Sequence, residues 1–297
     1  MATITTKGTL FNAELTKELF NKVQGHSAIA KLCGQSPMPF AGTDTFTFAM
    51  DGEIAIVGEG GQKPAGDASF DVITIKPIKV VYQHRLTDEF IHLAEEKQIP
   101  YLSAFTDGFA KKIARGFDIM AIHGVNPADN TASAIIGNNC FDKTITATAS
   151  VITYDADAPD DVLDLAVYPI RDNGEITGIA MSPVMASDIG RMKTTDSNLP
   201  IYPEFRFGGS PTAFNGIPLD VNSTVSFGNS KIRAIVGDFA NAFRWGFAEQ
   251  IPLEIIEYGD PDGQGDLKRL NQVVLRSEAF IGWGILDSKA FSKIETE

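Results

Sequence analysis

Apolar residues recur every three or four positions along residues 100–123, a spacing that predicts a long amphipathic helix. Its stripe consists of six large side chains: Leu102, Phe105, Phe109, Ile113, Phe117 and Met120. Lys111 and Arg115 fall on the other face, and Pro100 stands at the first turn, where a proline is tolerated. Six large apolar groups over about five turns predict a helix that is packed along its whole length.

Two other segments of the first half show the helical period. Residues 11–33 carry it through Leu15, Leu19, Phe20 and Val23. Gly34 and Pro37 predict the end of that helix. Residues 87–97 predict a short helix, opened by Thr87 as N-cap and by acidic residues in its first turn.

An alternating pattern between these helices predicts a long two-stranded arm. Residues 45–50 alternate polar and apolar side chains, and residues 70–83 form a second β run. The Gly-rich segment 58–66 joins the two runs, and Pro77 within the second run indicates an exposed edge. Because a two-stranded ribbon is only marginally stable alone in water, we expect it to rest on a partner chain.

The second half of the chain mixes helices and strands without a βαβ period, which indicates an α+β architecture. Helices are predicted over residues 160–168, ended by Pro169, and over 182–191, with Ser182 as N-cap; residues 239–244 are helix-like. The predicted strands cover residues 176–181, 217–221, 231–238, 251–257, 271–279 and 281–286. Residues 125–150 predict a surface loop with a short hairpin, and residues 259–265 predict a flexible loop.

The composition narrows the class of protein. A formal net charge of −13 argues against a protein that reads nucleic-acid sequence, although an acidic chain can still carry a local basic patch. No apolar run is long enough to predict a membrane span, and residues 1–10 do not resemble a signal peptide. Cys33 and Cys140 are far apart, which excludes a disulfide framework and favours a reducing compartment.

The motifs of common enzyme classes are missing from the sequence. The four histidines form no metal-binding spacing, and Gly58, Gly60 and Gly61 do not form a dinucleotide fingerprint. Lys63 is followed by proline, so the Gly-rich segment is not a phosphate-binding loop. We therefore expect no enzyme activity and predict no catalytic, cofactor-binding or metal site.

The order of the motifs resembles that of the major capsid proteins of tailed bacteriophages with the HK97 fold. A polar loop containing Lys63 is followed by a β return ending in RLTDE (residues 85–89) and by a long helix ending in His123–Gly124. Further along the chain, GIAMSP (178–183), FNGIPL (214–219), VGDF (236–239) and LNQVVLRSE (270–278) follow in the family's order. Each motif alone is weak, but their order extends over most of the chain.

The resemblance implies an α+β chain in five parts. These are an N-arm (1–44), an extended E-loop hairpin (45–84), a P-domain with a long spine helix (85–157), an A-domain (158–269) and C-terminal strands that return to the P-domain (270–297). It implies a major capsid protein whose hexamers and pentamers form an icosahedral shell around a double-stranded DNA phage genome. The shell would assemble in the bacterial host cytoplasm and remain as the virion capsid, without a cofactor or a membrane.

Two departures from the family pattern concern processing and crosslinking. Some members carry a long N-terminal scaffolding segment. The start at Met1 favours a chain that lacks this segment and uses a separate scaffolding protein; a processed form of a longer chain is the alternative. Portal and decoration proteins are further expected partners. A few members join a loop lysine to an asparagine with help from a glutamate, and Lys63, Asn271 and Glu278 stand at comparable places. Lys63 has polar neighbours that favour a solvated loop residue, and the odd spacing of Asn271 and Glu278 puts them on opposite faces of a regular strand.

Two alternatives remain at the level of the sequence. An encapsulin, a bacterial compartment of the same fold, would enclose protein cargo instead of DNA. An isolated α+β enzyme or binding protein would stay a monomer at concentrations where shells form.

Overall fold

The computed structural model describes residues 26–51, 56–63, 65, 67–89, 95–171, 174–248 and 253–297. Most of the helix expected over residues 11–33 lies outside these ranges. In the described part it is not continuous: Ser27 has extended dihedral angles and caps a separate short helix, α2 (Ala28–Leu32). Part of the short helix expected over residues 87–97 also lies outside them.

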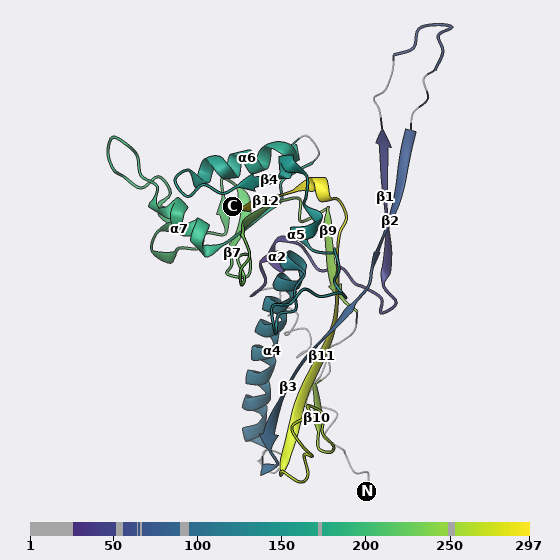
Figure 1. Ribbon diagram of the computed structural model, residues 1–297, viewed down its shortest axis with the longest axis vertical. Coiled ribbons are helices and arrows are strands. Elements are labelled where there is room, and N and C mark those ends of the chain that lie inside the picture. The colour runs from purple at the N-terminus through teal and green to yellow at the C-terminus, as the bar shows by residue number, and fades with distance from the viewer. Residues whose placement is uncertain are drawn as a thin grey trace.

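One long helix and one long strand run side by side through the lower half of the molecule in Figure 1. The helix is α4 (Glu95–His123), and the strand is β11 (Gln272–Ile285). β11 pairs antiparallel with β3 (Ile78–Thr87) on one side. On its other side it pairs antiparallel with β10 (Leu253–Ile256) and then with β9 (Phe243–Phe247).

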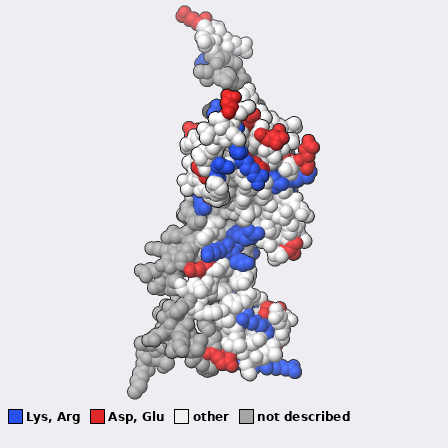
Figure 2. Space-filling model, turned by 90° about the vertical axis from the view of Figure 1, so that its left-hand side faces the viewer, with Lys and Arg blue, Asp and Glu red and all other residues white. Residues whose placement is uncertain are grey.

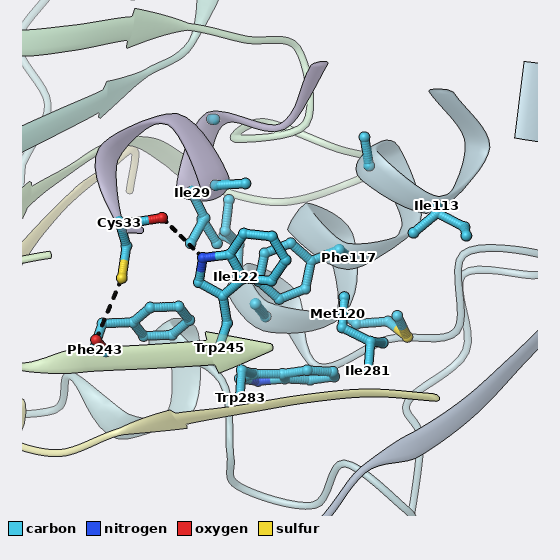
Figure 3. Close-up of a cluster of buried hydrophobic side chains, with 14 of the residues drawn as sticks. Ile29, Cys33, Ile113, Phe117, Met120, Ile122, Phe243, Trp245, Ile281 and Trp283 are labelled. Atoms are coloured by element: carbon cyan, nitrogen blue, oxygen red, sulfur yellow. Dashed lines mark hydrogen bonds between the residues drawn. The ribbon is translucent and has the colours of Figure 1, made fainter. Parts of the chain in front are cut away.

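The apolar stripe of α4 forms the main core, as predicted. All six of its large side chains are buried, while Lys111 and Arg115 are exposed. Phe117 lies between two indoles, with ring centroids 5.0 Å from Trp245 and 5.8 Å from Trp283 (Figure 3). Each indole N–H donates to a backbone carbonyl at 2.9 Å, of Cys33 for Trp245 and of Asn139 for Trp283, so no polar group is left without a partner when these rings are buried.

Pro100 and Pro169 do not mark the helix boundaries predicted at them. α4 runs without interruption from Glu95 through Pro100, and α6 (Pro159–Arg171) continues past Pro169. A proline removes one backbone hydrogen bond. Burial beyond it, as at Ile170 next to Pro169, offsets that loss.

The predicted two-stranded arm is present but shorter than expected. β1 (Thr43–Asp51) pairs antiparallel with β2 (Asp67–Ile75) over their whole length. The β run expected over residues 70–83 is divided at Pro77, and β3 beyond it pairs with β11 instead of β1. Pro77 has no N–H to donate to a ladder, which explains why the chain leaves one sheet there and enters another.

A second sheet forms the upper part of the molecule. In order, its strands are β4 (Val151–Thr153), β12 (Phe291–Glu295), β8 (Ile232–Gly237), β5 (Gly178–Met181), β7 (Ile217–Val221) and β6 (Ala213–Phe214). The β4–β12 and β5–β7 pairs are parallel and the others antiparallel. β12 was not predicted, and its pairing with β8 shows that only β11 among the last strands returns to the α4 sheet.

This sheet has a helical layer on one face and the main core on the other. Ala234 and Val236 pack with α6 and with α7 (Pro183–Arg191), whereas Ile235 between them belongs to the core that contains Ile29 of α2. The alternation of side chains along β8 thus joins two apolar clusters. Ser182 caps α7 as predicted, accepting a hydrogen bond from the Met185 N–H.

Three further expectations differ from the structure. Residues 239–242 form a turn instead of a helix, and β9 follows. The strands expected over 271–279 and 281–286 are one strand, because Phe280 and its neighbours continue the ladder to β3. In the loop after α4, a single bridge joins Val125 to Ala132, followed by α5 (Phe141–Thr144) and the 3-10 turn η2 (Thr148–Ser150). Two other 3-10 turns are η3 (Pro203–Gly208) and η4 (Ser288–Ala290).

No helix of the described residues is long and apolar enough to cross a membrane.

Three glycines on β9 and β11 allow other segments to pack directly against the backbone of the β11 sheet. Gly246 and Gly282 are cross-strand partners, and Gly284 follows two residues later. A Cβ atom would lie 1.9 Å from the Ser36 carbonyl at Gly246, and 2.7 Å from the Ile75 side chain at Gly284. The chain before β1 and the end of β2 therefore rest on a strip of the sheet that has no side chains.

We expect Gly246→Ala to lower the free energy of unfolding by about 1–3 kcal/mol, because the added methyl group would overlap with the Ser36 carbonyl. Ser36 cannot yield freely, since its N–H is bonded to the Trp245 carbonyl at 2.9 Å. Gly108→Ala, on the exposed face of α4 with no atom within 4 Å, is the control and should gain about 0.5–1 kcal/mol. Urea unfolding of the unassembled chain measures both; equal stability of the two variants would contradict this interpretation of the strip.

Candidate assembly surfaces

The β1–β2 hairpin projects far beyond the two sheets (Figure 1) and presents one apolar face. In its register Phe46 lies opposite Val72, and Phe70 stands two residues before Val72 on the same strand, so these three side chains share a face. The rings of Phe46 and Phe70 stack at 5.3 Å, yet both remain about two-thirds exposed, at 63% and 64%. Exposed aromatic rings side by side on a projecting ribbon are typical of an interaction surface.

Among the described residues, the base of this hairpin is the part packed against the rest of the molecule. Ile75 at the end of β2 is buried against the glycine strip, and Phe40 before β1 meets Phe280 edge-to-face at 4.9 Å. Near the base, the Thr74 hydroxyl donates to the Asp44 carboxylate across the ladder at 2.7 Å. The position of the hairpin is therefore fixed at one end, and its apolar face is left for another molecule.

The loop beyond the hairpin contains Lys63, the candidate crosslinking residue. Its described part turns tightly where the Gly61 N–H donates to the Gly58 carbonyl at 2.9 Å and Gly60 adopts a φ of +79°. Lys63 and Ile56 are exposed there. Nothing within the described residues shields the Lys63 ammonium group from water.

The other two candidate residues lie far from that loop. The β10 end of β11 lies at the end of the molecule opposite the hairpin (Figure 1). Asn271 directly precedes β11 there and has a φ of +52°. It is outside the strand, so strand alternation does not orient it relative to Glu278. The Glu278 carboxylate forms an ion pair with the Lys79 ammonium at 2.6 Å. One chain does not bring Lys63, Asn271 and Glu278 together.

A hollow of about 600 Å³ between β3 and α4 forms a second apolar surface. Val81 and Tyr82 of β3 line it on one side, Gly116 of α4 on another, and Ile135 from the loop after α4 on a third. Val81, Tyr82 and Ile135 are all exposed. β3 is also the outer strand of its sheet among the described strands, so it presents an edge beside this hollow.

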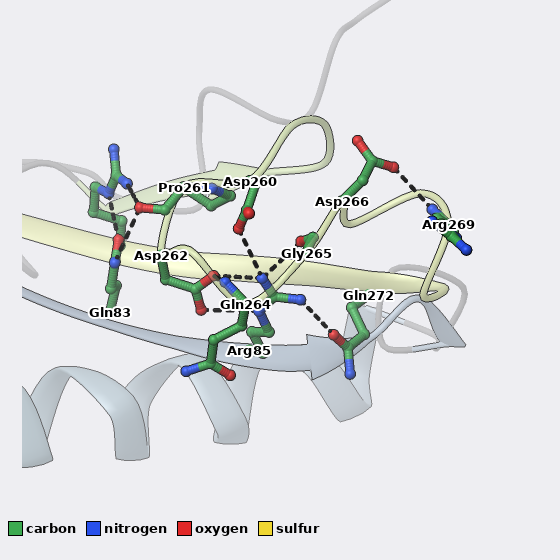
Figure 4. Close-up of polar contacts among 11 residues, drawn as sticks. Gln83, Arg85, Asp260, Pro261, Asp262, Gln264, Gly265, Asp266, Arg269 and Gln272 are labelled. Carbon is green, nitrogen blue, oxygen red and sulfur yellow. Dashed lines mark hydrogen bonds and ion pairs between the residues drawn. The ribbon is translucent and has the colours of Figure 1, made fainter.

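Arg85 fixes a loop that the sequence predicts to be flexible (Figure 4). Its guanidinium group donates to both Asp262 carboxylate oxygens, to the Gly265 carbonyl at 2.8 Å and to Gln272 at 2.9 Å. Asp260 accepts from the same group at 3.2 Å. The Arg85 hydrogen bond holds the pKa of Asp262 at about 2, well below its usual range. The loop of residues 259–265, which the sequence predicts to be flexible, is thus held in one conformation by the hydrogen bonds of Arg85.

Asp118 on α4 joins three segments of the chain. It is fully buried and accepts hydrogen bonds from the Ser27 hydroxyl, from the backbone N–H groups of Ala28 and Ile29, and from the Thr224 hydroxyl. The N–H groups belong to the first turn of α2, so Asp118 caps that helix from a distance. The spacing of apolar residues could not reveal this contact, because Asp118 lies 90 residues from Ala28.

The remaining titratable groups form no site of their own. The thiols of Cys33 and Cys140 are buried and free, and burial raises the pKa of both. Within the described ranges no group of three or more His, Cys, Asp or Glu side chains could hold a metal ion. On the face shown in Figure 2, Lys and Arg side chains lie in separate groups with Asp and Glu between them, without a continuous basic surface.

Comparisons with known proteins identify the class. The model of the phage capsid family matches residues 7–296. A solved chain from Mycobacterium phage Ogopogo is 30% identical, with a TM-score of 0.78 and 92% of each chain covered. A chain from Gordonia phage Cozz is 24% identical over 91% of this chain and 86% of its own, with a TM-score of 0.74. No curated protein sequence matches the chain.

A more distant structure shows the same fold. It is titled "Capsid of native GTA particle computed with C5 symmetry", is 14% identical and has a TM-score of 0.64, with 91% of this chain and 89% of that chain covered. The chain belongs to the phage capsid family. It is a major capsid protein, a shell subunit that associates with copies of itself, and neither the encapsulin nor the isolated enzyme is favoured.

The Asp118 contact predicts a pH dependence of stability. Burial raises the pKa of the Asp118 carboxyl from 3.8 to about 6, although the hydrogen bond from Ser27 and three others oppose the rise. The folded state therefore binds a proton that the unfolded state has lost between these values. The resulting stabilisation, about 3 kcal/mol, is present below pH 3.8 and disappears as the pH rises through 6.

Asp118→Asn removes this titration and leaves the other carboxylates in place. We expect the stability of the wild type relative to the variant, measured by urea unfolding of the unassembled chain, to fall by about 2 kcal/mol from pH 4 to pH 7. A difference that stays constant over this range would show that Asp118 does not titrate as described.

Proposed function

We propose that copies of this chain assemble into an icosahedral shell around a double-stranded DNA phage genome, and that the β1–β2 hairpin joins neighbouring copies. The exposed apolar face of the hairpin is the observation that carries this proposal. The shell would form in the cytoplasm of the bacterial host and persist as the virion capsid, with portal, scaffolding and decoration proteins as further partners.

The energetics of the hairpin favour a contact between copies. A two-stranded ribbon has little stability of its own, and this one is anchored only at its base. Burying Phe46 and Phe70 against a neighbour would stabilise the ribbon and the contact together, by about 1.5–3 kcal/mol for each side chain. Because each copy in a closed shell both gives and receives a hairpin, many such contacts sum to a stable particle.

In the terms of the HK97 fold, we propose that the hairpin and its loop are the E-loop and that α4 is the spine helix. The expected division into N-arm (1–44), E-loop (45–84), P-domain (85–157), A-domain (158–269) and C-terminal strands (270–297) needs adjustment to the strand pairing. β3, β9 and β10 all belong to the sheet of β11, which supports assigning them to the P-domain. The sheet of β4, β12, β8, β5, β7 and β6, with α6 and α7, then forms the A-domain.

We propose that the shell is held together without covalent crosslinks. Lys63 is exposed in a polar loop, whereas a lysine must be neutral, and hence desolvated, to attack an amide. Glu278 already pairs with Lys79 of its own chain. A negative surface facing the DNA would also limit sticking of the genome to the shell.

Deletion of residues 58–67 should leave the fold intact and prevent stable shells. Apart from Asp67, which pairs with Asp51 at the far end of the hairpin, the described part of this loop hydrogen-bonds only to itself, so the two sheets and α4 do not depend on it. Circular dichroism of the unassembled chain and electron microscopy of the assembly reaction measure the two effects. Lys63→Ala is the control and should form normal shells. Normal shells from the deletion variant would refute the E-loop assignment.

Boiling purified shells in denaturing detergent tests the absence of crosslinks. We expect one band at the mass of the chain, 32.0 kDa, because the lysine is solvated and the glutamate is paired. A ladder of covalent oligomers that disappears in Lys63→Ala shells would contradict this expectation and identify Lys63 as the crosslinking residue.

A further inference from the structure

Phe207 combines full exposure with a strained backbone. Its side chain is 101% exposed, and its φ and ψ of +57° and +31° lie in the left-handed region. Glycine adopts this region readily, but a residue with a side chain does so at an energetic cost. The Arg206 guanidinium group lies 5.4 Å from the ring centroid, and no other described residue contacts the ring as an aromatic or cationic partner. The fold of a single chain thus gains almost nothing from this side chain.

The backbone on both sides of Phe207 is held firmly in this conformation. Phe205 is buried, and its carbonyl approaches α7 so closely that a Cβ atom on Gly190 would lie 2.7 Å from it. After Phe207, the Gly209 N–H donates to the Arg206 carbonyl at 3.0 Å. A Cβ atom on Gly209 would lie 2.1 Å from the Glu204 carbonyl. Phe205 thus anchors the turn while Phe207 is presented to the outside.

Other apolar groups accompany Phe207 on the segment between α7 and β6. Leu199 and Ile201 are both exposed, and a hollow of about 360 Å³ beside Phe207 is lined by Pro183, Ala186 and Gly190 of α7, among others. This segment forms the left-hand end of the molecule in Figure 1, on the side away from the β1–β2 hairpin. A neighbour that covers the hairpin in one direction leaves this end free for another.

We propose that Phe207 is the anchor residue of a second contact between copies of this chain, separate from the hairpin contact. The inference rests on the shell-building function proposed above. The chain associates with copies of itself, so a second copy is the partner that every molecule meets at a fixed geometry. Burial of the ring against that copy offsets the energetic cost of the left-handed backbone at Phe207. Backbone strain of this kind is typically found at functional positions.

Phe207→Gly separates folding from assembly, because the two should respond in opposite directions. Glycine accepts the left-handed backbone, so the melting temperature of the unassembled chain should be no lower than that of the wild type. The subunit concentration needed for half-maximal shell formation should rise at least about tenfold, the effect of removing one interface anchor. Phe207→Trp keeps an aromatic ring and should stay within about threefold of the wild type.

Tyr168→Ser is the matched control in the same domain. Tyr168 is also an exposed aromatic residue, but it lies on α6 in regular helix. We expect its removal to change the assembly concentration less than twofold. A Phe207→Gly variant that assembles at the wild-type concentration would overturn the inference while leaving the hairpin contact untouched. Failure of the wild-type chain to assemble at all would overturn the proposed function itself.

Hydroxyl-radical footprinting of the wild type provides a second test that needs no variant. In the unassembled chain Phe207 should be oxidised readily, and in purified shells its oxidation should fall at least about fivefold because a second copy covers the ring. Equal oxidation of Phe207 in the two states would contradict the proposal, whatever the variants show.

Discussion

The packing of α4 against the β11 sheet is the interaction on which the rest of the structure depends. Phe117 lies between Trp245 and Trp283, which joins the helix to β9 and β11 at one point. The buried Asp118, the next residue, connects the same helix to α2 and to Thr224. Phe117 therefore connects α4 to the sheet of β11 through an apolar contact. Asp118 connects the same helix to α2 and to the loop before β8 of the upper sheet through hydrogen bonds.

The β1–β2 hairpin and the turn at Phe207 both expose apolar side chains outside the core formed by α4 and the β11 sheet. The base of the hairpin rests on a strip of glycines, and no described residue covers Phe46 and Phe70, which stay largely exposed. The turn at Phe207 likewise exposes an aromatic ring, on a backbone in the left-handed region. In both places the apolar groups that the single chain exposes lie on segments whose bases are firmly anchored. Pre-organised contacts lose little conformational entropy when copies associate.

Much of this organisation can be predicted from the sequence, and the failures have physical causes. The buried stripe of α4 is predictable because six large side chains repeat at the helical period. The start of α7 is predictable because Ser182, a good N-cap residue, is followed directly by Pro183. Pro100 and Pro169 mislead because packing outweighs one lost hydrogen bond. Residues 259–265 look flexible, yet Arg85, almost 180 residues away, pins them. Asp118, the glycine strip and Phe207 depend on contacts or dihedral angles that no local pattern encodes. Lys63, Asn271 and Glu278 came from the family resemblance, and a single chain does not assemble them.

A reconstruction of the purified shell by electron cryomicroscopy tests the central claim most directly. The account predicts a closed particle in which Phe46 and Phe70 of each hairpin are buried against an adjacent copy of the chain. It would be contradicted by a shell whose hairpins extend into solvent with both rings exposed, because the contacts between copies would then have to come from other surfaces.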